Sequence, residues 1–212
     1  MAHREKSNEK PLFEDFSPRH ISLTVEASLI PAFSRLLQNG FWIKGNVGCS
    51  VKSFLCEQFG LSTEYLENRI QTIFLDGDVV DDVERATVVD GDTLSLSAAM
   101  PGLAGAVLRK GGYYAGMRDQ ISCKGETTSA SMQYGKVLVK LFNMPLQELG
   151  PIFLKHGIWI EGYKLKDILK GRADDFQRGC REAFADGRQF EFKQFLGMGS
   201  GKEDIFLQVK SV

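Results

Sequence analysis

The residues that follow position 108 form the clearest group in this chain that could bind a charged ligand. Two consecutive glycines can turn their backbone N–H groups toward one anion, and guanidinium and ammonium groups beside them would add positive charge. The spacing differs from that of the known phosphate-binding loops, because neither GxxxxGKS/T nor GxGxxG occurs between a strand and a helix. A short glycine turn flanked by solvated cations is the alternative interpretation. The candidate ligand-binding residues are Arg109, Lys110, Gly111, Gly112, Tyr113 and Arg118.

No group of residues has the spacing of a catalytic or metal-binding site. The histidines, His3, His20 and His156, fit no triad or HExxH pattern, and no serine stands in a GxSxG elbow. The acidic group at 76–84 has Thr87 where a calcium loop carries its last glutamate, so it indicates turns. The sequence therefore predicts no catalytic residue, no metal and no cofactor, and it favours a protein that is not an enzyme.

The cysteines predict reduced thiols. They form no CxxC pair and have no histidine nearby, whereas a structural zinc site needs its ligands in close local pairs. Reduced thiols are usual in the cytosol. The polar residues 1–10 also lack the apolar stretch of a secretory signal, so we expect a cytoplasmic protein. The four cysteines are Cys49, Cys56, Cys123 and Cys180.

A short sequence phrase occurs twice, at 40–45 and at 157–162, and each copy contains one of the two tryptophans of the chain. The offset of 117 residues also holds upstream, and 29–45 shares six identities with 146–162. Self-similarity at a fixed offset indicates a duplicated unit. Trp42 and Trp159 are therefore predicted to be structural anchors of the two copies, and stacking on a ligand is the alternative.

Each copy is expected to have the order strand, helix, strand, helix, strand, strand. In the first copy, alternating apolar residues predict a strand at 21–25 and an apolar stripe predicts a helix at 29–37. The remaining expected elements are strands at 41–43, 72–75 and 93–98 and a helix at 50–59, followed in the second copy by strands at 137–141, around Trp159, at 190–193 and at 205–209, with helices at 146–154 and 165–169. The predicted organisation is a mobile N-terminal arm (1–20), a first α/β unit (21–98), a Gly-rich connector (99–136) and a second α/β unit that is a diverged copy of the first (137–212).

The segment 50–105 resembles ubiquitin-like β-grasp sulfur carriers, the small subunit of molybdopterin synthase and the thiamine sulfur carrier. The shared features are a helix, a strand that ends in a turn at 75–77, an Asp-Gly-Asp turn at 90–92 and a tail with Pro and Gly at 100–102. The resemblance implies a β-grasp-like part within an α+β fold. It also implies chemistry at a C-terminal Gly-Gly, whose carboxylate is adenylated and then thiolated in those carriers. This chain continues past Gly112 to Val212, so Gly112 could act in that way only after cleavage.

Composition and charge limit the partners. The net charge is −1, with 26 basic and 27 acidic residues, which argues against a broad electrostatic grip on nucleic acid or on an anionic membrane. A local basic patch is compatible with this balance. The longest uncharged run, 93–108, contains Pro101 and does not predict a membrane span. We expect no nucleic acid and no membrane as partner.

The connector is the place where function is expected, because duplication does not account for it and long connections are often functional. The leading hypothesis is a non-catalytic binding or assembly module that contacts a protein partner or a small anionic ligand through 99–118, and a homo-oligomer is compatible with it. One alternative is a processed sulfur carrier or ubiquitin-like modifier that acts through Gly112. Another is a small enzyme with a site between the two units.

Overall fold

A mixed α and β fold, as expected, is seen in the computed structural model, which describes residues 19–118, 132–192 and 202–212. Ten strands form one sheet in the order β11-β10-β1-β12-β9-β2-β8-β7-β4-β5, and β3 pairs with β6 in a small second sheet. The strands are β1 (His20–Val25), β2 (Phe41–Val47), β3 (Cys49–Ser50), β4 (Thr72–Leu75), β5 (Asp78–Val79), β6 (Thr87–Val88), β7 (Thr93–Ser97), β8 (Gln133–Phe142), β9 (Ile158–Glu161), β10 (Cys180–Ala185), β11 (Arg188–Gln189) and β12 (Asp204–Ser211).

The large sheet consists of two five-strand halves that meet at β2 and β9. Outward from β2, the pairings with β8, β7, β4 and β5 are antiparallel, parallel, antiparallel and antiparallel. Outward from β9, the pairings with β12, β1, β10 and β11 follow the same order. The strand β1 therefore lies among strands from 158–211, and β8 lies among strands from 41–97. The strands of the two predicted units are interleaved in the sheet.

The repeated tryptophan phrase forms the two strands at the junction of the halves. Trp42 on β2 is paired with Trp159 on β9, and the two strands run antiparallel. Their neighbours Phe41, Ile43 and Ile160 are buried in the core, as is Ile158. Because side chains alternate along a strand, both tryptophans lie on the opposite face of the sheet, where they are half-buried.

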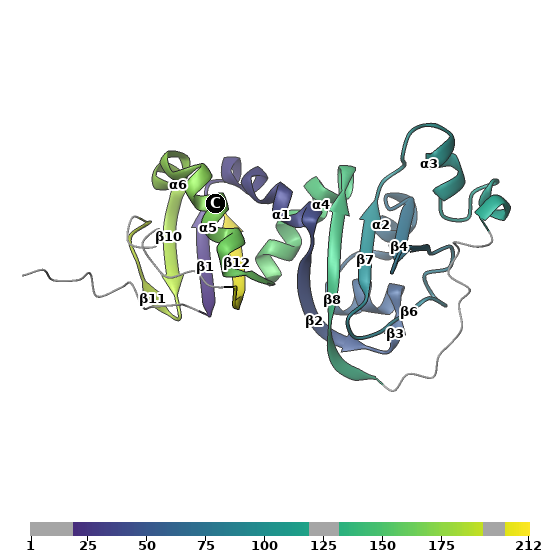
Figure 1. Ribbon diagram of the computed structural model, residues 1–212, viewed down its shortest axis with the longest axis horizontal. Helices are drawn as coiled ribbons and strands as arrows, with labels where there is room; N and C mark the ends of the chain where they lie inside the picture. The colour runs from purple at the N-terminus through teal and green to yellow at the C-terminus, as the bar shows by residue number, and fades with distance from the viewer. Residues whose placement is uncertain (1–18, 119–131, 193–201) are drawn as a thin grey trace, which may run out of the picture.

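Helices cover the face of the sheet that carries the buried residues. Figure 1 shows the two halves of the sheet toward the two ends of the molecule, with α1 and α4 near the middle. The buried ring of Phe153 on α4 packs 5.3 Å from the ring of Phe41 and 5.8 Å from that of Phe59, in the half that holds β2. The Lys155 carbonyl on the same helix accepts from Gln208 Nε2 on β12 at 2.8 Å, so α4 contacts both halves. The helices are η1 (Ala27–Phe33), α1 (Ser34–Asn39), η2 (Ser53–Gln58), α2 (Thr63–Asn68), α3 (Gly102–Leu108), η3 (Ala115–Arg118), α4 (Asn143–His156), α5 (Gly162–Gly171) and α6 (Ala173–Gly179).

Three of the expected elements differ from those in the structure. The helix expected at 29–37 is split into a 3-10 turn and a short α-helix, because Pro31 within η1 has no N–H to donate to an α-helical hydrogen bond. The helix expected at 50–59 is wound as a π-helix over Ser53–Gln58. The expectation of a strand at 190–193 was wrong over 190–192, the part that the structure describes. A hairpin of β10 and β11 precedes these residues, with Asp186 and Gly187 at positive φ in its turn.

Candidate functional site

The connector after β7 folds into a short helical hairpin over the part that the structure describes, 99–118. The helix α3 turns back on the residues before it, and a Cβ atom at Gly105 would lie 1.7 Å from the Met100 carbonyl oxygen. Only glycine permits this approach. Figure 1 shows α3 at the end of the molecule that holds β4 and β7, where it stands apart from the sheet.

A buried arginine holds this hairpin together and attaches it to the body. The Arg118 side chain is only 1% exposed, and its two terminal nitrogens donate to the two carboxylate oxygens of Asp81 at 2.6 and 2.9 Å. Its Nε donates to the Val107 carbonyl at 2.6 Å, and one terminal nitrogen also donates to the Arg109 carbonyl at 3.1 Å. A guanidinium has the planar fork of donors that suits a two-oxygen partner. Arg118 is thus committed to structure in this conformation.

The partner carboxylate, Asp81, also fixes the glycine turn. Its Oδ1 accepts the Gly111 N–H at 2.8 Å. Partial burial by itself would raise the pKa of Asp81, but the hydrogen bonds from Arg118 and Gly111 and the charge of Arg118 outweigh it and hold the pKa below its usual value. The carboxylate is therefore ionised at neutral pH. The sequence analysis assigned Asp81 to turn chemistry and did not connect it with Arg118.

The two cations beside the glycines are also engaged with the body. Arg109 Nε donates to Gln71 Oε1 at 2.7 Å, and the Lys110 N–H donates to the Gln71 carbonyl at 2.7 Å. The Lys110 ammonium donates to the Leu66 carbonyl at 2.9 Å. Burial lowers the pKa of Lys110, although the charge of Glu67 opposes the shift. Both side chains anchor the connector to the segment 66–71.

The two glycines do not present free N–H groups to a ligand in this conformation. The Gly111 N–H is taken by Asp81, and the Gly112 N–H donates to the Arg109 carbonyl at 3.0 Å. An anion could still lie against the side chains. A pocket of about 530 Å³ is present between α2 and the hairpin. It is lined by Glu67, Asn68, Gln71, Ala106, Arg109, Lys110, Gly111, Gly112, Tyr113 and Tyr114.

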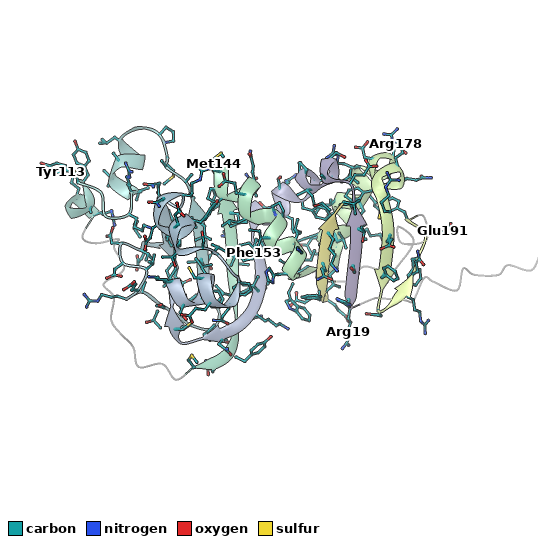
Figure 2. All side chains as sticks on the ribbon, turned by 180° about the vertical axis from the view of Figure 1, so that it is seen from behind. Arg19, Tyr113, Met144, Phe153, Arg178 and Glu191 are labelled. Carbon is teal, nitrogen blue, oxygen red and sulfur yellow. The ribbon has the colours of Figure 1, made fainter. Side chains whose placement is uncertain are left out.

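Large apolar side chains of the hairpin are exposed. Leu103 is 73% exposed, Tyr113 is 95% exposed and Met117 is 74% exposed. Figure 2 shows Tyr113 at the extreme end of the molecule, directed away from the body. The sequence analysis named Tyr113 but not Leu103 or Met117, because a single leucine or methionine in a connector has no periodic signal that separates it from a core residue.

The described residues contain no arrangement that points to a particular reaction. No group of three or more His, Cys, Asp or Glu side chains could hold a metal ion within the described ranges. The thiols of Cys49, Cys56 and Cys180 are half-buried, and burial raises the pKa of each, so they are poor nucleophiles at neutral pH. Cys123 and residues 1–18 of the predicted arm lie outside the described residues.

Within the described residues, every helix is too short or too polar to cross a membrane. Comparison of the chain with protein-family models, with curated proteins and with solved structures found no match.

Proposed function

We propose that this protein is a non-catalytic binding or assembly module that contacts a protein partner through its 99–118 connector. The observation that carries the proposal is the exposure of Leu103, Tyr113 and Met117 on one hairpin, which the Arg118–Asp81 ion pair holds in a fixed position. Exposed apolar side chains that gather on one small projection are typical of contact sites. A preorganised segment also loses less conformational entropy on binding.

The hydrogen bonds of the connector favour a protein partner over a small anion. Arg109 and Lys110 already donate to Gln71 and Leu66, so an anion would have to displace these contacts or accept poorly aligned donors. A protein surface needs no such change. It can bury the tyrosine and methionine side chains as they stand, and tyrosine is enriched among residues that dominate binding energy.

A photo-crosslinking residue tests this proposal directly. Benzoylphenylalanine replaces Tyr113 in the full chain, and the same residue at Tyr163 on α5, which is 39% exposed, is the matched control. In a lysate of the cells that make the protein, irradiation should give a discrete adduct from position 113 and none from position 163. The added changes Leu103→Ser and Met117→Ser should abolish it. Absence of an adduct at 113, or the same adducts from both positions, would contradict the proposal.

We also infer that the two halves of the sheet derive from one duplicated α/β unit that is β-grasp-like in part. The identical order of antiparallel and parallel pairings outward from β2 and from β9 supports this inference. So does the pairing of the two repeated tryptophans at the centre. If it is correct, the binding connector is an insertion between two equivalent units, and its removal should leave the sheet able to form.

The deletion of 103–117 with a short Gly-Ser linker tests this point. Retention of far-UV circular dichroism and cooperative unfolding is expected. Loss of cooperative unfolding would show that the connector is part of the fold instead of an added contact site.

A further inference from the structure

A row of ring side chains crosses the sheet on the face opposite the core. His20 on β1 is paired with Phe206 on β12, Phe206 with Trp159 on β9, and Trp159 with Trp42 on β2. These four residues, here called the aromatic row, therefore lie in register on four neighbouring strands. The rings of His20 and Phe206 are stacked with centroids 5.0 Å apart, and those of Phe206 and Trp159 are 5.4 Å apart.

The row is accessible to a ligand. Trp42, Trp159 and Phe206 are half-buried and His20 is exposed, whereas the residues that alternate with them are in the core. Neighbouring strands are about 4.8 Å apart, so four strands give a row about 14 Å long. This length suits a few stacked planar groups.

The glycine that precedes each tryptophan by two positions makes room for the row. A Cβ atom at Gly157 would lie 2.0 Å from the Phe206 ring, and one at Gly40 would lie 3.1 Å from the Leu138 side chain. Phe206 and Leu138 are the partners of Trp159 and Trp42 on the outer neighbouring strands. The repeated phrase therefore shapes this face as well as the junction of the halves.

Two lysines lie together on one side of the row. Lys44 and Lys136 are directly opposite each other on β2 and β8, an arrangement that is unfavourable for like charges. The Lys44 ammonium lies 3.4 Å from the centroid of the Trp159 ring, and that of Lys136 lies 4.6 Å from the centroid of Trp42. Both lysines are exposed, and neither has an ion-pair partner among the described residues.

The acidic residues of this face are on the other side of the row. Glu161 and Asp204 are paired on β9 and β12, and Glu161 forms an ion pair with Lys164 at 2.6 Å. The side of Lys44 and Lys136 therefore offers an anion two cations that are unpaired within the described part of the chain, whereas the other side carries charges of both signs, including Lys140 beside Gly40. A ligand that fits has planar groups along the row and negative charges on the side of Lys44 and Lys136.

We propose that this face binds single-stranded nucleic acid, with bases stacked on the aromatic row and phosphates beside Lys44 and Lys136. Aromatic platforms next to a basic track are the usual means of binding single strands without sequence preference. Each ammonium leaves a tryptophan ring for a phosphate and a base takes its place. A base stacks on Phe206 when the exposed His20 ring turns away from it. The net charge of −1 excludes a broad electrostatic grip, but this contact is local and needs two cations.

The chain provides its own reporter for the test, since its two tryptophans are both in the row. The full chain is titrated at low salt with fluorescein-labelled (dT)10, and binding is read as anisotropy and as quenching of tryptophan fluorescence. Two phosphate contacts predict a slope of about −1.4 for log K against log salt. Lys44→Gln with Lys136→Gln should bring this slope close to zero, while Arg35→Gln with Lys170→Gln, on the helix-covered side, should leave it unchanged.

A second variant and two further ligands separate stacking from charge. Phe206→Leu keeps both tryptophans and both lysines and should weaken binding by about 5-fold to 150-fold, the range for the loss of one stacked base. A duplex of equal length should bind at least about tenfold more weakly than (dT)10, because its bases are stacked on each other and cannot reach the aromatic row. Thymidine monophosphate should also bind at least about tenfold more weakly, because it offers one base and one phosphate instead of several.

Several results would overturn the proposal. These are absence of quenching by (dT)10, equal affinity for the duplex or the mononucleotide, and an equal loss in the Arg35 and Lys170 control. Self-association through this face is another, and it would appear in sedimentation as a dimer that Phe206→Leu dissociates. Circular dichroism shows whether each variant is folded. If Phe206→Leu does not fold, the surface lysine variants still decide the test.

Discussion

Arg118 and Asp81 form a two-pronged ion pair across 37 residues of sequence, with both nitrogen–oxygen distances below 3 Å. The guanidinium is buried, whereas the carboxylate is 35% exposed on its side chain. Removal of the carboxylate would take away the two oxygens that accept from the terminal nitrogens of this buried guanidinium. The pair therefore controls the position of the whole connector hairpin.

Asp81→Asn is expected to destabilise this hairpin. Breaking a buried ion pair typically costs about 3–5 kcal/mol, and access of water to this carboxylate places the expected loss near the lower end, at about 3 kcal/mol. The loss is local, so trypsin should cleave after Arg109 and Lys110 faster than in the wild type. Asp78→Asn removes the same charge from an exposed position and is the control. Equal cleavage rates in the two variants would exclude the ion pair as the clamp.

Gly157→Ala tests the close approach at the aromatic row. Gly157 has φ +102°, and the added Cβ would lie 2.0 Å from the Phe206 ring. Gly187→Ala is the matched control, because Gly187 has φ +77° but nothing within 4 Å of its added Cβ. Backbone strain at such a positive φ costs about 1–3 kcal/mol by itself. In urea unfolding, Gly157→Ala should lose that amount plus a further 1–3 kcal/mol or so from the displaced ring, and an equal loss in both variants would refute the contact.

Phe153→Ala tests whether α4 unites the core. The ring is fully buried between Phe41 and Phe59, and Figure 2 shows Phe153 near the middle of the molecule. Truncation of a buried phenylalanine costs about 3–5 kcal/mol. Ile152→Ala, one residue earlier on the same helix and 37% exposed, should cost less than about 1.5 kcal/mol. If the halves are one cooperative unit, Phe153→Ala should lower a single unfolding transition instead of separating two.

The strands could be predicted from the sequence because one face of the sheet is buried. Ile21, Leu23 and Val25 alternate with polar residues, and so do Val137, Val139 and Leu141, since each set faces one core. Alternation fixes the face of a strand but not its neighbour. The sequence near β1 and β8 therefore does not indicate that each strand lies in the half formed mainly by the other predicted unit. The hairpin at Asp186-Gly187 does have a local signal, because an Asp-Gly pair is typical of a two-residue β-turn.

The residue types of the connector predicted the position of the candidate site in the sequence, but not the partners of its side chains. The sequence analysis singled out Arg109, Lys110 and Arg118 as cations near glycines, and the structure brings all three to the same hairpin. Their partners lie at Gln71, Leu66 and Asp81, between 37 and 44 residues away in the chain. A side chain's partner at such a separation depends on the path of the sheet, which a single sequence does not specify. Whether these residues bind a ligand stays a prediction.

The stability of the protein should depend on pH through Asp92, and with an unusual sign. Asp92 is 7% exposed, and burial raises its pKa to about 6, helped by the nearby carboxylates of Asp76 and Asp90 and opposed by the hydrogen bond from the Val89 N–H. The folded protein therefore binds this proton more tightly than the unfolded chain. Its contribution to stability is complete below about pH 4 and is lost as the pH rises through about 6.

Asp92→Asn isolates this contribution, because asparagine keeps an oxygen acceptor for the Val89 N–H and cannot ionise. The free energy of unfolding of Asp92→Asn minus that of the wild type should be near zero at pH 4 and should increase up to about pH 7. Asp81→Asn gives the opposite course, since the lowered pKa of Asp81 stabilises the wild type above about pH 4 and that advantage fades only as the pH falls through the folded pKa. Urea unfolding of all three proteins at intervals between pH 3 and 7 measures both curves. A flat difference for Asp92→Asn would show that the pKa of Asp92 is the same in the folded and the unfolded protein.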